Sequence, residues 1–130
     1  MQSQEKFQLQ IDPIDQIRAD LLEVFPYEGE TQLIQYTTNE FSAVCPFSGL
    51  PDVAQVIIEY IPDKFCLELR SLKYYFISYR SVGIYQEQAT NRIFNDFHKL
   101  LNPKYLKITT KYNTRGGIDS ICTIQKGKLT

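Results

Sequence analysis

The fold of this chain is decided at a turn-rich stretch, residues 42–52, that reads Ser-Ala-Val-Cys-Pro-Phe-Ser-Gly-Leu-Pro-Asp. Its two prolines and its glycine prevent a continuous strand or helix, so the segment must fold back on itself. The turn can bring Cys45 and Asp52 towards one pocket, where a thiolate nucleophile needs a base, a cation or a hydrogen-bond donor beside it. The more usual interpretation of such a loop is a small buried cysteine followed by an aspartate that caps the turn.

Strands are expected on both sides of this stretch. Residues 31–44 are rich in Thr, Tyr, Ile and Phe, and residues 53–61 read Val-Ala-Gln-Val-Ile-Ile-Glu-Tyr-Ile, so the two segments are predicted to pair across the turn. Residues 105–112 and 118–125 predict a second hairpin, because Asn-Thr-Arg-Gly-Gly separates them. A single Arg-Gly-Gly between two strands is far more typical of a turn than of an RNA-binding segment.

Helical periodicity appears between the two hairpins. Apolar and aromatic residues recur at helical spacing from Leu72 to Tyr79, with Ser71 available near the start, and the pattern is stronger over residues 87–101. Near the amino terminus, Asp12-Pro13 before a run of spaced Ile and Leu predicts a short amphipathic helix that ends before Pro26. An extended arm fits that segment nearly as well.

The order strand, strand, helix, helix, strand, strand predicts an α+β fold, with an antiparallel four-stranded sheet and two helices on one face. The open edges of such a sheet have to be covered or paired, and assembly into a ring would do this. A chain of 130 residues is expected to form one domain, 1–130, with residues 1–30 as an amino-terminal arm.

Charge and cysteine usage exclude several functions. The net charge of −1 gives no overall attraction to nucleic acid or to an anionic membrane, and no segment approaches the ~20 apolar residues needed to span a bilayer. We therefore expect a soluble, cytoplasmic protein with no direct nucleic-acid or membrane partner. Three cysteines and a single histidine, without paired spacing, argue against both a disulfide framework and a metal site.

A dinucleotide, if one binds, has to be held without the Rossmann glycine turn, because no G-x-G-x-x-G occurs in the sequence. Basic side chains would then meet its phosphates. The charged cluster Glu68, Arg70, Lys73 and Arg80 is compatible with such a phosphate site, although a solvated helix face explains it as well.

Five separate motifs occur in a fixed order between residues 36 and 126. They are Cys-Pro-Phe-Ser-Gly-Leu-Pro-Asp (45–52), Glu-Tyr-Ile-Pro-Asp (59–63), Glu-Leu-Arg-Ser-Leu-Lys (68–73), Glu87 with Thr-Asn-Arg-Ile (90–93), and Tyr-Asn-Thr-Arg-Gly-Gly-Ile (112–118). In content and spacing they resemble the single-domain 7-cyano-7-deazaguanine reductases, the NADPH-dependent nitrile reductases of queuosine biosynthesis. The resemblance implies the tunnelling fold (T-fold), with subunit sheets joined into homo-oligomeric rings and active sites at subunit boundaries.

The resemblance also implies a mechanism. Cys45 would attack the nitrile carbon to form a covalent thioimidate while Asp52 protonates the nitrogen, and NADPH would then supply hydride twice to give the aminomethyl product. Arg70 replaces a usual lysine, and Gln86 stands where some relatives have histidine, so a histidine-assisted proton transfer is not implied here and Gln86 can only position. The implied site residues are Cys45 and Asp52 for catalysis, Leu67, Glu68, Leu69, Gln86 and Glu87 for the deazapurine substrate, and Arg70, Ser71 and Lys73 for NADPH.

Two other functions compete with the reductase. A related archaeal branch, the QueF-like amidinotransferases, transfers ammonia to a nitrile-bearing tRNA base, and it lacks the Glu-x-x-Ser-x-Lys motif that this chain has at residues 68–73. A non-catalytic, ring-forming binding protein is the third possibility, and it gives no reason for Cys45 and Asp52 at the family spacing.

Overall fold

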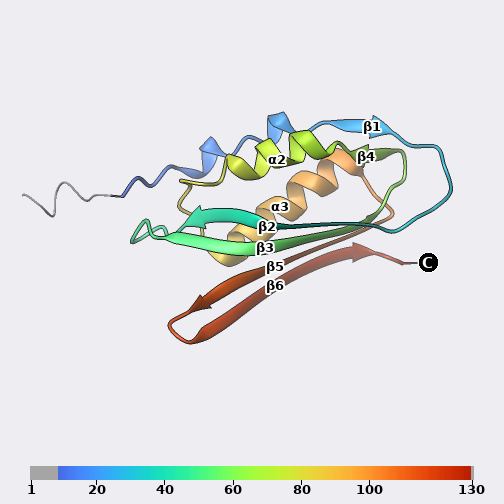
Figure 1. Ribbon diagram of the computed structural model, residues 1–130. Helices are drawn as coiled ribbons and strands as arrows, with labels where there is room; N and C mark the ends of the chain where they lie inside the picture. The colour runs from blue at the N-terminus through green and yellow to red at the C-terminus, as the bar shows by residue number, and fades with distance from the viewer. Residues whose placement is uncertain (1–8, 130) are drawn as a thin grey trace, which may run out of the picture.

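A computed structural model describes residues 9–129; residues 1–8 of the predicted arm, and residue 130, lie outside the described part of the chain. A four-stranded antiparallel sheet has the order β2-β3-β5-β6, and two helices cover one of its faces (Figure 1). Its elements are β2 (Ile34–Val44), β3 (Pro51–Ile61), β5 (Tyr105–Arg115), β6 (Ile118–Gly127), α2 (Leu69–Ile77) and α3 (Gln86–Leu101). The predicted order of strands and helices is therefore confirmed.

Alternation along the two central strands sets which face carries the helices. In β3, the side chains of Ala54, Val56, Ile58 and Tyr60 are fully buried, while the residues between them are half-buried. Strand β2 keeps the same alternation at its second half only because its register shifts between Thr38 and Phe41. A bulge of this kind adds a residue to one strand and returns the apolar side chains to the core face.

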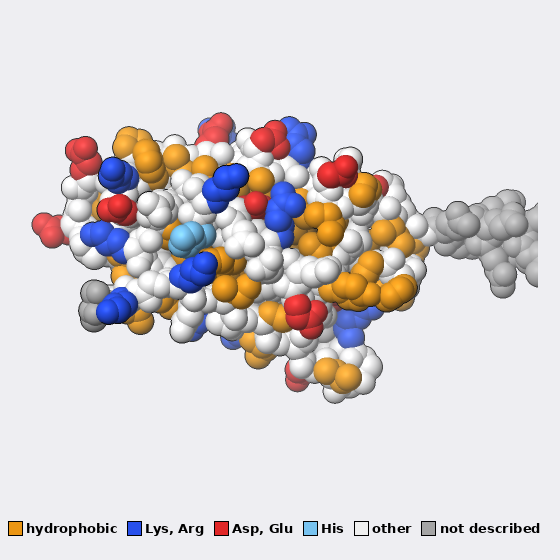
Figure 2. All heavy atoms as spheres, turned by 180° about the vertical axis from the view of Figure 1, so that it is seen from behind, with side chains coloured by type: hydrophobic (Ala, Val, Ile, Leu, Met, Phe, Trp, Pro, Cys, Tyr) orange, Lys and Arg blue, Asp and Glu red, His pale blue; other side chains and the backbone are white. Residues whose placement is uncertain are grey.

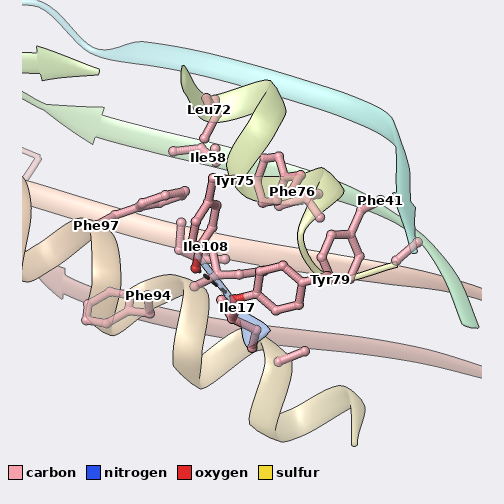
Figure 3. Close-up of a cluster of buried hydrophobic side chains, with 14 of the residues drawn as sticks. Ile17, Phe41, Ile58, Leu72, Tyr75, Phe76, Tyr79, Phe94, Phe97 and Ile108 are labelled. Atoms are coloured by element: carbon pink, nitrogen blue, oxygen red, sulfur yellow. Dashed lines mark hydrogen bonds between the residues drawn. The ribbon is translucent and has the colours of Figure 1, made fainter. Parts of the chain in front are cut away.

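The core between the sheet and the helices is dominated by aromatic rings, as Figure 3 shows. Phe41 packs edge-on against Tyr79 at 5.0 Å between ring centroids, and Tyr75 lies 5.5 Å from Phe97. The Tyr75 hydroxyl donates to Asp96 at 2.6 Å and lies 2.7 Å from the Tyr79 hydroxyl. Polar atoms of α2 and α3 are thus joined inside an apolar layer, which fixes the two helices relative to each other.

Helix α2 begins earlier than its apolar spacing suggests. Its N-cap is Glu68, whose carboxylate accepts hydrogen bonds from the N–H groups of Ser71 at 2.8 Å and Arg70 at 2.9 Å. The Ser71 hydroxyl donates to the Glu68 carbonyl at 2.8 Å and accepts from the Glu23 N–H at 2.9 Å. The first turn of α2 is therefore bonded to the amino-terminal segment.

The predicted amphipathic helix near the amino terminus is wrong, and the extended alternative is closer to the structure. The segment forms two single-turn 3-10 helices, η1 (Ile14–Gln16) and η2 (Ala19–Leu21), separated by an extended Ile17. The Arg18 N–H bonds to the Ser78 hydroxyl at 3.0 Å. Contacts with α2 thus replace the internal hydrogen bonds that a longer helix would need.

A second, two-stranded sheet was not predicted. Strand β1 (Val24–Pro26) pairs antiparallel with β4 (Phe65–Leu67) beside the start of α2. Its strands are three residues long, too short for an alternating pattern to reveal. Among residues 9–129, no helix combines the length and the apolar composition needed to cross a membrane.

Candidate active site

Three segments that are distant in sequence meet at one end of the sheet. Figure 1 shows the β2–β3 loop, the first turn of α3 and the β5–β6 turn at the same end of the molecule. The Val44 N–H donates to the Val82 carbonyl at 3.0 Å, and the Ile84 N–H donates to the Val44 carbonyl at 3.2 Å. The end of β2 is thereby bonded to the segment that leads into α3.

The β2–β3 loop is closed by its own backbone. The Cys45 N–H donates to the Leu50 carbonyl at 3.0 Å, and the Gly49 N–H donates to the Cys45 carbonyl at 2.8 Å. Gly49 has a φ of 71°, a left-handed conformation that side chains disfavour. A Cβ at this position would also lie 2.8 Å from the Leu9 Cβ, so the loop requires glycine both for its conformation and for its space.

Cys45 has the features of a reactive thiol. Hydrogen bonding from the Ser48 hydroxyl lowers the pKa of Cys45, and the backbone N–H groups of Ser48 and Phe47 lower it further, as does the positive charge of Arg115. Each of these interactions favours the thiolate, which is the nucleophilic form. The predicted loop therefore does more than hold Cys45 in place, because its donors also activate the sulfur.

Asp52 occupies a position that a core residue would normally take. It belongs to the alternating face of β3 that carries Ala54 and Val56, and it is only 7% exposed. Its Oδ1 lies 3.2 Å from Nη1 of Arg115, and the Gln86 amide donates to both of its carboxylate oxygens at 3.4 Å. A carboxylate at a buried position is stable only with such partners.

The four predicted residues Cys45, Asp52, Gln86 and Glu87 line one pocket of about 280 Å³. Glu87 lies in the first turn of α3, where the helix dipole favours a negative charge. Arg115 also lines this pocket, and the sequence analysis treated it only as part of a turn. The signal that would have identified it is the aspartate on a core-facing position, because a buried carboxylate requires a nearby cation or donor.

The remaining predicted substrate residues lie elsewhere in the chain. Leu67, Glu68 and Leu69 are at the start of α2, which Figure 1 places at the end of the helical layer away from the β2–β3 loop. Leu67 is fully buried and its N–H donates to the Tyr60 hydroxyl at 3.0 Å. The backbone N–H groups of Arg70 and Ser71 hold the pKa of the Glu68 carboxyl below its usual value, so this group serves as a helix cap here.

The predicted cofactor residues have different surroundings. Lys73 and Arg80 lie with apolar α2 and β2 side chains around a groove of about 230 Å³. Arg70 is exposed, and Ser71 is buried with its hydroxyl bonded to Glu68 and Glu23. Two cations beside an apolar surface suit the phosphates and rings of a dinucleotide. Ser71 supports the helix that carries Lys73, and its hydroxyl is already engaged.

Hydrophobic side chains are exposed around the candidate site. Phe47 is 81% exposed, and its ring packs edge-on against that of Tyr85 at 6.0 Å between centroids. Figure 2 shows apolar side chains gathered at this end of the molecule. Across residues 9–129, no group of three or more His, Cys, Asp or Glu side chains is placed to hold a metal ion.

Comparisons with known proteins find relatives that share one name. Proteins named NADPH-dependent 7-cyano-7-deazaguanine reductase from Thermotoga petrophila and Thermotoga maritima are each 54% identical to this chain over 116 residues, covering 88% of it and 83% of the relative. One of the same name from Caldicellulosiruptor bescii is 48% identical over 108 residues, covering 82% of each chain.

A solved structure described as the archaeosine synthase QueF-Like in the apo form matches with a TM-score of 0.71 at 26% identity, covering 78% of this chain and 100% of the other. This match confirms the predicted α+β, T-fold architecture. A family model described as QueF-like protein matches residues 51–130, which include Asp52, Gln86, Glu87 and Arg115. The chain therefore belongs to the QueF-like protein family.

Proposed function

We propose that this protein is a cytoplasmic, NADPH-dependent reductase that converts the nitrile of 7-cyano-7-deazaguanine to an aminomethyl group, in the biosynthesis of queuosine in tRNA. The observation that carries the proposal is the pocket that brings the Cys45 thiol, the buried Asp52 carboxylate and the Glu87 carboxylate together. The relatives that are 54% identical carry the name of this activity.

The first chemical step is addition of the thiol to the nitrile. The Cys45 sulfur forms a bond to the nitrile carbon, one π bond of the C≡N group breaks, and its electron pair takes a proton at nitrogen. Asp52 accepts the thiol proton and returns it to the nitrogen, so the step needs no external acid or oxidant. The Ser48 donors that lower the pKa of Cys45 favour the thiolate, which is the form that adds to the nitrile.

Glu87 supplies recognition of the deazapurine. A carboxylate accepts hydrogen bonds from a ring N–H and an exocyclic amine, which a guanine-like base presents side by side. Its place in the first turn of α3 fixes the carboxylate relative to Cys45, because the segment before α3 is bonded to the end of β2. Gln86 holds Asp52 in the same pocket.

The residues of α2 and of the turn after it fit a dinucleotide. When bound, one NADPH would supply a hydride to the thioimidate, and a second NADPH would supply another to the imine. Lys73 and Arg80 would meet its phosphates beside the apolar side chains of the groove, and Arg70 adds a cation on the exposed surface of the same helix. Ser71 keeps the first turn of the helix in place.

A second copy of the chain would complete the site. The groove at Lys73 and the pocket at Cys45 share no lining residue, and the start of α2, where Leu67, Glu68 and Leu69 lie, is far from the β2–β3 loop (Figure 1). A ring in which residues 1–130 of each chain act as one T-fold domain, with residues 1–30 as an arm, would bring the two parts together. It would also cover the exposed Phe47 and pair the open edges of β2 and β6.

The test is covalent labelling without cofactor. Wild-type protein incubated with 7-cyano-7-deazaguanine and no NADPH should gain the mass of the nitrile on the peptide that contains Cys45. Cys45→Ala should show no adduct and no turnover, and Asp52→Asn should keep most binding while losing turnover, because an amide cannot transfer the proton. An adduct on Cys66 or Cys122 would refute the assignment of the nucleophile.

NADPH consumption separates the reductase from the alternatives. The structural match to an archaeosine synthase keeps an amidinotransferase acting on nitrile-bearing tRNA as the second candidate. That enzyme would form the adduct but would consume ammonia instead of NADPH. A non-catalytic binding protein would form no adduct. Oxidation of NADPH that depends on the nitrile, with release of the amine, is the expected result.

A further inference from the structure

Arg115 reaches the candidate site from β5, a strand that contributes no other residue to the pocket. It ends β5, and the register between β5 and β6 shifts between Tyr112 and Arg115. A register shift of this kind changes the direction in which a side chain leaves the strand. Here the guanidinium crosses to the start of β3, where Nη1 lies 3.2 Å from Asp52 Oδ1 and 3.2 Å from the Pro51 carbonyl.

The two oxygens of Asp52 are held unequally. Oδ1 has the Arg115 guanidinium at 3.2 Å and the Gln86 amide at 3.4 Å, whereas Oδ2 has only the Gln86 amide at 3.4 Å. A cation that pairs with one carboxylate oxygen disfavours a proton on that oxygen more than a long contact to a neutral amide does. A proton is therefore less favoured on Oδ1, beside the cation, than on Oδ2.

We propose that Arg115 is a positioning residue for the proton transfer: by holding Oδ1 of Asp52, it makes Oδ2 the oxygen that takes the Cys45 proton and returns it to the nitrile nitrogen. This inference rests on the proposed function. It also explains why Arg115 lies against a nearly buried carboxylate although its own side chain is 38% exposed. An exposed ion pair on its own stabilises a fold very little.

The charged and titratable groups around this pocket come from every element that lines it. They are Cys45 of the loop, Asp52 of β3, Tyr85 before α3, Glu87 of α3 and Arg115 of β5, with Tyr112 close enough for the charges of Asp52 and Glu87 to contribute to the raised pKa of its hydroxyl. Arg115 is the cation of the set. Removing Arg115 leaves the Asp52 and Glu87 carboxylates without a cation in this pocket. Their negative charges then disfavour the thiolate of Cys45.

The experiment compares Arg115→Gln, Arg115→Lys and the matched control Lys111→Gln, an exposed residue of the same strand. The rate of nitrile addition to Cys45 without NADPH should fall about ten- to a hundredfold in Arg115→Gln, recover partly in Arg115→Lys, and stay unchanged in Lys111→Gln. The pH profile of the addition should move to higher pH in Arg115→Gln only. Thermal unfolding shows whether each variant is folded. If Arg115→Gln does not fold, Arg115→Lys is compared with wild type in its place.

Two outcomes would overturn the inference. Wild-type addition rates in Arg115→Gln, combined with a higher NADPH requirement, would make Arg115 a cofactor contact. An unchanged pH profile for alkylation of Cys45 by iodoacetamide in Arg115→Gln would show that Arg115 does not alter the charge that Asp52 presents to the thiol. Alkylation needs neither nitrile nor NADPH, so it tests the role of Arg115 even if the wild type forms no adduct with the nitrile. The absence of that adduct would refute the proposed function and would leave the test of Arg115 intact.

Discussion

At the residue scale, the reactivity of Cys45 depends first on its own loop. The Ser48 hydroxyl is the largest contribution to the lowered pKa of Cys45, ahead of the backbone N–H groups and of Arg115. Ser48→Ala is therefore expected to raise the pKa of Cys45 towards the value of an ordinary thiol. Alkylation by iodoacetamide, measured across pH, should become slower below the new pKa and should match wild type at higher pH, where both thiols are ionised.

The control for this prediction is Ser120→Ala, which removes a hydroxyl from β6, a strand that β5 separates from the loop-bearing strands β2 and β3. Peptide mass spectrometry separates the label on Cys45 from label on the buried Cys66 and the half-buried Cys122. An identical pH profile in Ser48→Ala and wild type would assign the activation of Cys45 to the backbone donors alone.

The sequence predicts residues of this site unevenly. Cys45 and Asp52 were expected together because the turn folds back on itself, whereas Gln86 and Glu87 were expected only from the family resemblance; all four line one pocket. Arg115 was missed because Arg-Gly-Gly fits a hairpin turn so well that the arginine needed no further explanation. Its direction depends on a register shift in β5, which local sequence does not encode.

At the scale of elements, α2 and α3 are joined by a buried polar contact. The Tyr75 hydroxyl donates to Asp96, which also pairs with Arg92 at 2.8 Å. Tyr75→Phe would keep the aromatic packing but leave Asp96 with one partner fewer, and we expect it to lower the free energy of unfolding by about 1–3 kcal/mol. Chemical denaturation measures this, and Tyr74→Phe, on the 54% exposed neighbour, should change stability by less than about 0.5 kcal/mol.

The elements that the sequence predicts well are the long ones. Strands β3 and β5 and helix α3 repeat their apolar pattern over 11 or 16 residues, so the period is clear. The helix predicted for the segment before β1 was wrong for the opposite reason. Ile17 and Leu22 are each buried in the hydrophobic core, and their helix-like spacing reflects two separate contacts with it.

At the scale of the whole molecule, buried tyrosines make folding sensitive to alkali. Burial raises the pKa of Tyr60, Tyr75, Tyr79 and Tyr112 above the ordinary value of ~10. The unfolded chain loses these protons near pH ~10 while the folded chain keeps them, so the folded state binds more protons there. Stability should be complete below that pH and fall as pH rises through it. Urea midpoints at neutral pH and at about pH 11 test this, and equal midpoints would contradict it.

Assembly gives a second prediction for the whole molecule. If Lys73 and Cys45 of one site come from different chains, oligomers mixed from Cys45→Ala and Lys73→Ala subunits should recover part of the activity at limiting NADPH. Oligomers mixed from Cys45→Ala and Glu87→Ala subunits should recover none, because these two side chains line the same pocket of one chain. Native mass spectrometry verifies the mixing, and recovery in the second pair alone would reverse the assignment.

The turn between β5 and β6 has a consequence for spectroscopy. A Cβ added at Gly116 or Gly117 would meet nothing within 4 Å, so the turn is open to solvent. It lies at the same end of the molecule as the β2–β3 loop (Figure 1). The chain contains no tryptophan, so a single indole introduced at the exposed Asn113 would be the sole fluorophore of its kind. Its emission would follow the arrival of a base at the pocket in real time, without a label on the thiol.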